Sequence, residues 1–227
     1  MAASQQAVTF GRVDARHDRI LVVASGPSAN ALPIDSIRDA AIGGAHIIAV
    51  NRAILWMPLA HSWFTLDPDR RVLPILRGAM DDVNRYAAVP DDYGTSMARV
   101  IYHRCDVPNG ITYLRRIAGD GPLGSRDTLS EDPGSIHTGN SAYGAFGLAY
   151  LMKPQKIAMV GVDGTRRRYA YSRDRPLRSM DHLPALFRSS VSQVLGSGIE
   201  VRNGSKESRV GCYERCNPEE AVRWVMR

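Results

Sequence analysis

The sequence predicts an α/β domain built on a mostly parallel, doubly wound sheet. Short apolar runs of strand length alternate with longer segments typical of helices, which is the pattern of parallel α/β folds. Apolar residues make up 44% of the 227 residues, enough to bury the core of one good-sized α/β domain or of two small ones. Several predicted strands end in small or polar residues, and such sheets bind ligands at the carboxyl ends of their strands.

The first half of the chain contains most of the predicted strands. They are residues 19–24 (RILVVA), 46–50 (HIIAV), 62–66 (SWFTL) and 99–103 (RVIYH). The first is a continuous apolar run, as expected of a strand that is buried on both faces. Asp35 is placed to cap a helix that runs to about Ile42 and ends at Gly43-Gly44. A second helix is expected over residues 70–80, although Pro74 interrupts it.

The second half begins with a long loop and then returns to alternating elements. Residues 120–134 are rich in Gly, Pro, Ser and Asp, which predicts a loop of the kind that often serves as a lid or a binding loop. Further helices are expected over residues 140–151, 182–195 and 218–226, and further strands over 156–160 and 199–202. We interpret the whole as a single Rossmann-like domain over residues 19–227, with a lid-like loop and an N-terminal extension over residues 1–18.

The charge of the chain favours anionic partners. The formal net charge is +6, carried mainly by arginine, and a basic surface attracts nucleotides, nucleic acids or phosphorylated glycans. Six arginines lie close together in the sequence: Arg166, Arg167, Arg168, Arg173, Arg175 and Arg178. No lysine-rich tail, zinc-finger spacing or aromatic RNA-binding motif accompanies them, so a solvated basic loop is the alternative.

The sequence does not indicate a membrane protein, a disulfide-stabilised protein or a metal-binding protein. No apolar run approaches the roughly 20 residues that span a bilayer, and the N-terminus lacks the apolar core of a signal peptide, so we expect a cytoplasmic protein. The cysteines Cys105, Cys212 and Cys216 do not suggest a disulfide scaffold, and Cys212 and Cys216 have no second ligand pair that would predict zinc. The six histidines form no metal-binding pair, and we predict no metal or cofactor.

The turn after the first strand, Ser25-Gly26-Pro27-Ser28, is a candidate nucleotide site. Gly26 would let a ligand approach the backbone, while the hydroxyls and amides of Ser25 and Ser28 suit a phosphate. Pro27 removes one donor but stiffens the turn. The alternative is an ordinary connection between a strand and a helix.

Polar residues also end the next two strands and begin a later helix. Asn51 can both donate and accept, which suits a base or a sugar, and Asp67 accepts from hydroxyls and amines or binds a metal. Thr138, Asn140 and Ser141 open the helix at residue 140, where free amides and the positive end of the helix dipole favour phosphate. Capping and turn formation are the alternatives for each of these residues.

The residues that suit a reaction lie near the arginine cluster. A neutral imidazole at His182, beside Asp181, suits a general base, whereas a surface or capping histidine is the alternative. Tyr169 lies among the arginines, and a tyrosine hydroxyl together with an arginine such as Arg168 can stabilise a departing phosphate.

Together and in this order, these stretches resemble the bacterial CMP-sialic-acid-dependent sialyltransferases of glycosyltransferase family 42. The similar stretches are ASGPS, IIAVNRA, WFTLDP, HTGNSAYGA, VGVDG, the segment Tyr169-Ala170-Tyr171 and the histidine at His182. They run from about Leu21 to His182, and their order is more specific than any one motif. The strand-end pattern is also similar to that of a related group, the MptE-like 6-hydroxymethylpterin diphosphokinases.

The resemblance implies an inverting, metal-independent transfer of a sialic-acid-like sugar from a CMP-activated donor to the hydroxyl of a glycan or another acceptor. It implies that a nucleotide site is lined by Ser25, Gly26, Ser28, Asn51 and Asp67, with the cytidine or its phosphate held by Thr138, Asn140 and Ser141. Tyr169 would hydrogen-bond the departing phosphate, and His182 would deprotonate the acceptor. The oligomeric state, including a homo-oligomer, stays open.

Two departures from the family keep other functions open. Asp67 stands where the family has an asparagine, and an arginine triplet ending at Arg168 stands where a first tyrosine is expected near Thr165. A pterin diphosphokinase would use ATP and Mg²⁺, with Asp67 and Asp163 as candidate metal ligands. A third alternative is a non-catalytic protein that binds nucleotide or nucleic acid through its arginines.

Overall fold

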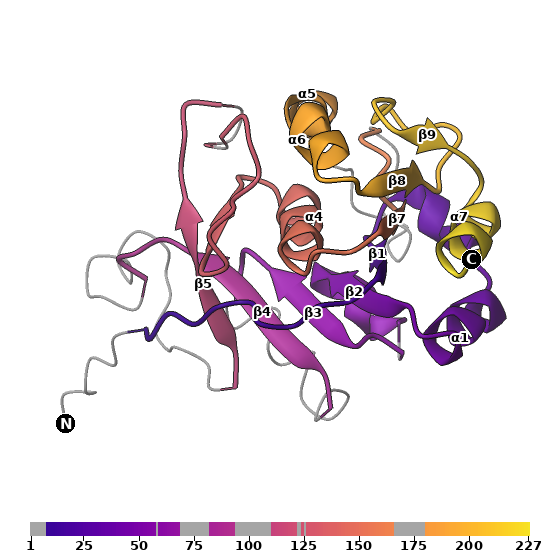
Figure 1. Cartoon of the computed structure of the whole chain (residues 1–227), viewed down its shortest axis with the longest axis horizontal. Helices are drawn as coiled ribbons and strands as arrows, with labels where there is room; N and C mark the ends of the chain where they lie inside the picture. The colour runs from indigo at the N-terminus through magenta and orange to yellow at the C-terminus, as the bar shows by residue number, and fades with distance from the viewer. Residues whose placement is uncertain are drawn as a thin grey trace, which may run out of the picture.

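The described residues of the computed structural model form a nine-stranded sheet in which every strand pair is parallel (Figure 1). The structure describes residues 8–57, 59–68, 82–93, 110–121, 124, 126–165 and 180–227. The strands are β1 (Arg19–Val23), β2 (His46–Val50), β3 (Ser62–Thr65), β4 (Asn84–Val89), β5 (Thr112–Ile117), β6 (Ser135–His137), β7 (Lys156–Val160), β8 (Glu200–Asn203) and β9 (Glu214–Arg215). Their order across the sheet is β6-β5-β4-β3-β2-β1-β7-β8-β9.

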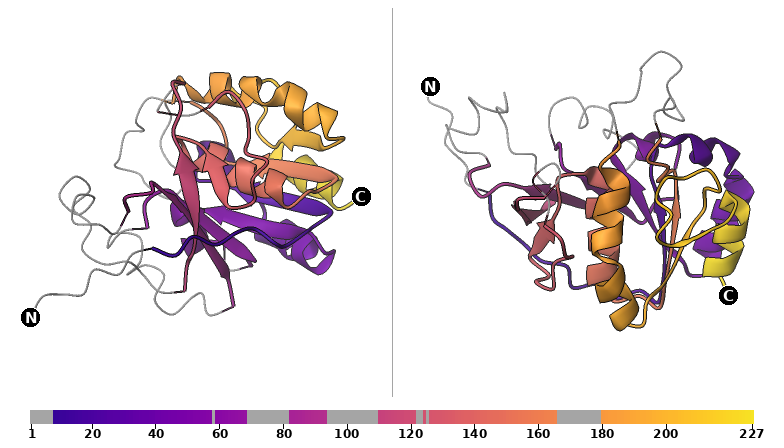
Figure 2. Two further views of the ribbon diagram at one scale, coloured as in Figure 1. Left: turned by 60° about the vertical axis from the view of Figure 1, so that its left-hand side comes forward. Right: turned by 90° about the horizontal axis from the view of Figure 1, so that it is seen from above.

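Helices cover both faces of this sheet, as Figure 2 shows from above. They are η1 (Pro27–Ala31), α1 (Ile34–Ile42), η2 (Asn51–Leu55), α4 (Ser141–Leu151), α5 (Leu183–Ser189), α6 (Val191–Gly196) and α7 (Pro218–Val225). Helix α4 packs on β1, β2, β3 and β6, with α5 beside it, whereas α7 packs on β1, β7 and β8 together with α1. The prediction of a mostly parallel, doubly wound sheet is therefore confirmed.

The central strands are buried because they face a helix on each side. In β1, Ile20 and Val22 belong to the core under α4, while Leu21 and Val23 belong to the core under α1 and α7. Since successive side chains of a strand point to opposite faces, both faces must be apolar, and the sequence accordingly reads as a continuous apolar run.

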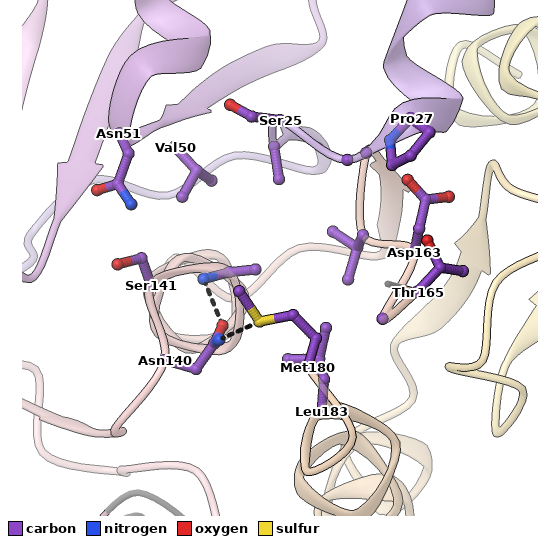
Figure 3. Close-up of a pocket in the computed structure, with 16 residues that line it drawn as sticks. Ser25, Pro27, Val50, Asn51, Asn140, Ser141, Asp163, Thr165, Met180 and Leu183 are labelled. Carbon is purple, nitrogen blue, oxygen red and sulfur yellow. Dashed lines mark hydrogen bonds between the residues drawn. The ribbon is translucent and has the colours of Figure 1, made fainter. Parts of the chain in front are cut away.

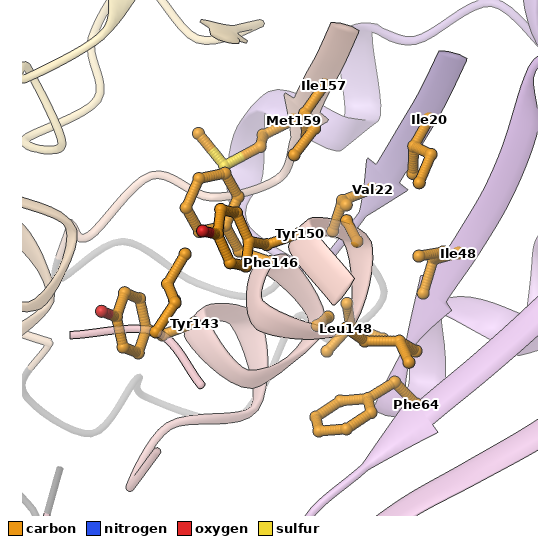
Figure 4. Packing of buried hydrophobic residues seen from close by; sticks show 14 of the residues in the cluster. Ile20, Val22, Ile48, Phe64, Tyr143, Phe146, Leu148, Tyr150, Ile157 and Met159 are labelled. Atoms are coloured by element: carbon orange, nitrogen blue, oxygen red, sulfur yellow. The ribbon is translucent and has the colours of Figure 1, made fainter. Parts of the chain in front are cut away.

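Helix α4 is buried along nearly its whole length, which explains its small and apolar composition. Every residue from Tyr143 to Leu151 is buried, and Figure 4 shows this helix packed on Val22, Ile48 and Phe64 of the sheet. A Cβ atom at Gly144 would lie 2.7 Å from a carbon of the Phe64 ring, so only glycine allows this close approach.

The strand order reverses between β1 and β7. The chain moves outward from β1 to β6, returns through α4, and adds β7 on the other side of β1. The connections that leave β1 and β7 therefore lead toward opposite halves of the sheet, to β2 and to β8, and doubly wound sheets bind ligands at the carboxyl edge where the strand order reverses in this way.

Several predicted elements differ from the observed ones. The helix expected over 182–195 is two helices that meet at Ser190, whose hydroxyl donates to the Phe187 carbonyl. Helix α1 begins at Ile34 after Pro33, so Asp35 lies in its first turn instead of capping it. Strands β4, β5, β6 and β9 were not predicted. The helix expected over 70–80 and the strand expected over 99–103 lie outside the described residues.

The predicted N-terminal extension and the predicted lid-like loop both contact the rest of the domain. Residues 8–18 run across the sheet (Figure 1): Val13 is buried in the core under α4, and Gly11 N donates to the Tyr113 carbonyl at 2.9 Å. Within the stretch expected to form a lid, Leu129 is held at both its backbone N–H and its carbonyl by the Gln193 side chain of α6. Among the described residues, no helix has the length and apolar character that a membrane crossing requires.

Candidate functional site at the carboxyl edge of the sheet

A cavity of about 170 Å³ lies at the reversal point between β1 and β7 (Figure 3). Its wall combines the loops after β1, β2 and β7 with the start of α4 and the residues before and in α5. The lining residues are Ala24, Ser25, Gly26, Pro27, Val50, Asn51, Asn140, Ser141, Ala142, Gly161, Val162, Asp163, Gly164, Thr165, Met180 and Leu183. Five residues predicted from the sequence therefore meet here: Ser25, Gly26, Asn51, Asn140 and Ser141.

The turn after β1 is in close backbone contact with the turn after β7. The backbone N–H of Gly26 donates to the Gly161 carbonyl at 2.8 Å. A Cβ atom at Gly26 would lie 2.2 Å from an Asp163 carboxylate oxygen, and one at Gly161 would lie 2.2 Å from the Ala24 carbonyl. Gly26 was expected to let a ligand approach the backbone, but the contact that excludes a side chain here is the close approach of these two turns.

Ser25 presents to the site a buried hydroxyl that no described residue satisfies. Its Oγ is shielded from solvent and has no hydrogen-bond partner among the described residues, and the same holds for the Thr165 hydroxyl. Both residues line the cavity. Because a buried polar group without a partner costs free energy, these hydroxyls are suited to accept or donate hydrogen bonds to a ligand.

Asn51 is held in a left-handed backbone conformation at the end of β2. Its φ is 52°, a region that asparagine tolerates better than most residues. Its carbonyl accepts from the Trp63 indole at 2.8 Å, and its side-chain Oδ1 accepts from the Thr65 hydroxyl at 2.7 Å. With its oxygen engaged by Thr65, Asn51 can offer a ligand the N–H groups of its side-chain amide.

Hydrogen bonds within the segment from Thr138 to Tyr143 stabilise the start of α4. Asn140 caps the helix, since its Oδ1 accepts from the backbone N–H groups of Ala142 and Tyr143 at 2.8 and 3.2 Å. Thr138 is fully buried beneath it and exchanges hydrogen bonds with the backbone of Asn140, so its hydroxyl serves this turn. Ser141, the first residue of the helix, is half-buried and lines the cavity.

Asp163, at the end of β7, is a main residue of the site. The glycosyltransferase prediction did not include it, and it was considered only as a metal ligand of the diphosphokinase alternative. It is 5% exposed, and its Oδ2 accepts from the backbone N–H and the hydroxyl of Ser28 at 3.0 and 3.1 Å. Ser28 was expected to line the nucleotide site, but its hydroxyl is engaged by Asp163 and by the Gly161 N–H. The signal in the sequence was the stretch VGVDG directly after a buried strand.

A second cavity of about 300 Å³ adjoins the first on the far side of Asp163. The two cavities share Pro27, Asp163 and Thr165, and the second one also contains Ser28 and Lys206. It lies over the ends of β7 and β8 and reaches the start of α7. The carboxyl edge of the sheet therefore offers two adjacent compartments.

His182 directly precedes α5, at its N-cap position, and lies in the chain between two residues that line the first cavity, Met180 and Leu183. Burial lowers the pKa of its imidazole, and the nearby Asp181 carboxylate opposes this effect. Asp181 itself pairs with Arg209. The Nε2 atom of His182 is shielded from solvent and has no hydrogen-bond partner among the described residues, and no side-chain cap is formed.

The other predicted residues lie apart from this cavity or outside the described chain. Asp67 is exposed after β3, where its backbone N–H donates to the Thr65 hydroxyl at 3.0 Å. Arg168 and Tyr169 lie outside the described residues. In the described part of the chain, no group of three or more His, Cys, Asp or Glu side chains is arranged to hold a metal ion.

The same fold occurs in the MAf glycosyltransferase from Magnetospirillum magneticum AMB-1, with a TM-score of 0.52 and 15% sequence identity. The match covers 96% of this chain and 39% of that one, so the chain spans about two fifths of the length of that protein, and the likeness shows the fold alone. The sialyltransferase CstII from Campylobacter jejuni, in complex with cytidine-5′-monophosphate, matches at a TM-score of 0.35 and 9% identity over 89% of this chain and 86% of that one, too weakly to carry an argument. No protein-family model and no curated protein matches the chain.

Proposed function

We propose that this protein is a glycosyltransferase that binds a CMP-activated, sialic-acid-like donor in the cavity between β1 and β7 and transfers the sugar, with inversion, to an acceptor hydroxyl. The observation that carries the proposal is the convergence of Ser25, Gly26, Asn51, Asn140 and Ser141 on one cavity at the reversal point of the sheet. The fold shared with a glycosyltransferase supports it.

The lining suits a nucleotide in chemical detail. The positive end of the α4 dipole, at Ser141, favours a phosphate. The hydroxyl of Ser25, which has no partner among the described residues, and the side-chain N–H groups of Asn51 can hydrogen-bond the phosphate, the ribose or the base. None of these contacts requires a metal ion.

His182 is the proposed general base. Burial lowers its pKa, so its imidazole is neutral at pH 7 and can accept a proton. The proton of the acceptor hydroxyl moves to His182 as the acceptor oxygen bonds to the anomeric carbon and the bond between that carbon and the phosphate breaks, releasing CMP. We assign the departing phosphate to Tyr169 and Arg168, which lie outside the described residues.

A thermal-shift panel with CMP, CDP, UDP, GDP and ATP, each with Mg²⁺ and with EDTA, tests the nucleotide. A ligand that binds only the folded state at ~100 times its dissociation constant stabilises it by roughly 2.7 kcal/mol. We expect CMP or CDP to raise the melting temperature equally with and without metal. Stabilisation by ATP only with Mg²⁺ would favour the diphosphokinase, and salt-sensitive binding of polynucleotide alone would favour a nucleic-acid-binding protein.

His182→Ala tests the base once a donor is found. We expect the variant to bind nucleotide as the wild type does and to lose transfer by about 100-fold or more. His17→Ala is the matched control, because His17 lies before β1 at the opposite edge of the sheet and should leave transfer unchanged. Near wild-type transfer by His182→Ala would show that the base is another group.

A further inference from the structure

Three loops of the site meet at the Asp163 carboxylate. The turn after β1 reaches it through Ser28, which donates both its backbone N–H and its hydroxyl to Oδ2. The loop after β8 reaches it through Ser205, whose hydroxyl donates to Oδ1. Asp163 itself follows β7, and its carbonyl accepts from the backbone N–H of Arg209 at 2.8 Å.

Among the described residues, neutral donors and not a cation compensate this buried carboxylate. Asp163 is 5% exposed, and in the described part of the chain no lysine or arginine forms an ion pair with it. Removing a carboxylate from water is costly unless hydrogen bonds replace its hydration, so the three donors must stay in place as long as the carboxylate does. The arrangement thereby fixes the relative positions of the loops.

The hydroxyl of Ser28 extends this connection back to β7. It donates to Asp163 and accepts from the Gly161 N–H at 3.0 Å, so one side chain links both ends of the Gly161–Asp163 turn to the turn after β1. The Gly26–Gly161 backbone hydrogen bond of 2.8 Å lies alongside. Ser25, whose hydroxyl has no partner among the described residues, is three residues from Ser28 in the turn that these contacts hold.

We propose that Asp163 is the positioning residue of the site: its carboxylate holds the Ser25–Ser28 turn in the shape that presents Ser25 and the Gly26 backbone to the ligand, without contacting the reacting atoms. The nucleotide part of the inference rests on the function proposed above. It differs from a metal-ligand role, because hydrogen-bond donors, which a cation would have to displace, already occupy both carboxylate oxygens.

Two substitutions separate positioning from charge. Asp163→Ala removes the acceptors for Ser28 and Ser205. Asp163→Asn keeps an oxygen for the Ser28 N–H and places an amide N–H₂ opposite Ser205, whose hydroxyl can turn to accept. Gln193→Ala is the matched control, because it also removes side-chain hydrogen bonds to backbone groups, those of Leu129, but neither residue lines the cavity.

The experiment measures amide hydrogen exchange in the segments 25–31 and 161–165, together with the affinity for CMP in EDTA. We expect Asp163→Ala to raise exchange in both segments and to weaken CMP binding by about tenfold or more, as loss of hydrogen bonds to a charged group implies. Asp163→Asn should restore most of both properties, and Gln193→Ala should change neither. If Asp163→Ala does not fold, Ser28→Ala should show the same changes to a smaller extent.

Two results would overturn the inference: unchanged exchange in both segments of Asp163→Ala, or an Asp163→Asn variant as impaired as Asp163→Ala, which would point to the charge. Because exchange is measured without ligand, it tests the positioning role even if the wild type binds no nucleotide. A wild type that binds no nucleotide would count against the proposed function alone and not against the positioning role of Asp163.

Discussion

Acid should destabilise this fold through a histidine stack at the edge of the sheet opposite the cavity. The His46 ring stacks on His17 at a centroid distance of 3.7 Å and lies 5.3 Å from the His61 ring. His46 is 6% exposed, and its Nε2 is 2.8 Å from the hydroxyl of buried Ser62. Burial, together with the charges that His17 and His61 would carry, lowers the pKa of His46 from 6.5 to about 3.

The sign and size of the effect follow from this shift. Below pH 6.5 the unfolded chain binds a proton at His46 that the folded protein binds only near pH 3, so stability is full above pH 6.5 and falls as the pH is lowered. Each pH unit in this window costs about 1.4 kcal/mol, so His46 alone removes about 3 kcal/mol between pH 7 and pH 4. Burial lowers the pKa values of His17 and His61 too, although Asp18 opposes the shift at His17.

The double variant His46→Phe, Ser62→Ala removes the titrating group, keeps an aromatic ring in the stack and leaves no buried hydroxyl without its partner. Ser62→Ala alone is the reference. Urea unfolding at pH 7 and pH 4 gives the free energy of unfolding of each. We expect the loss between the two pH values to be smaller by about 3 kcal/mol in the double variant than in the reference. Equal losses would refute the assignment of the acid sensitivity to His46.

The remaining predictions concern single contacts. Gly26→Ala would place a Cβ atom 2.2 Å from an Asp163 oxygen, so we expect urea unfolding to show a loss of roughly 3 kcal/mol, and an unchanged midpoint would contradict the close approach. Asn51→Gly keeps the positive φ but removes the hydrogen bond from Thr65, so its free energy of unfolding should fall by about 1 kcal/mol. Asn51→Ala removes the same hydrogen bond and also strains the backbone, so it should lose about 1 kcal/mol more. Equal losses in the two variants would exclude that strain. Asn217→Ala removes the capping box of α7 and should cost about 1 kcal/mol in the same assay, whereas no loss would mean that water replaces the cap.

The central sheet was predictable because its strands are buried on both faces. A strand such as β7, with Ile157 and Met159 on one side and Ala158 and Val160 on the other, reads as an apolar run with no polar interruption. Strand β5 escapes this signal because it lies next to the sheet edge and includes Arg115 and Arg116, which are not buried. Strands as short as β6 and β9 contain too few residues to show a period.

The position of the candidate cavity was more predictable than the contacts that each of its residues makes. Strand ends and a helix start indicate which segments meet, because parallel strands bring their carboxyl ends to one edge. Which hydroxyls stay available depends on tertiary partners: Ser28 is engaged by Asp163, 135 residues away in the chain, whereas no described residue engages the hydroxyl of Ser25. A local sequence pattern holds no information about a partner at that distance.

In the proposed function, the cavity between β1 and β7 binds the nucleotide of the donor. The most direct test is a calorimetric titration of the wild type and of Ser25→Ala with CMP in EDTA. We predict that the wild type binds CMP and that Ser25→Ala binds it about five- to tenfold more weakly, as expected for the loss of one hydrogen bond. A wild type that does not bind CMP, or a Ser25→Ala variant that binds it equally well, would contradict the claim.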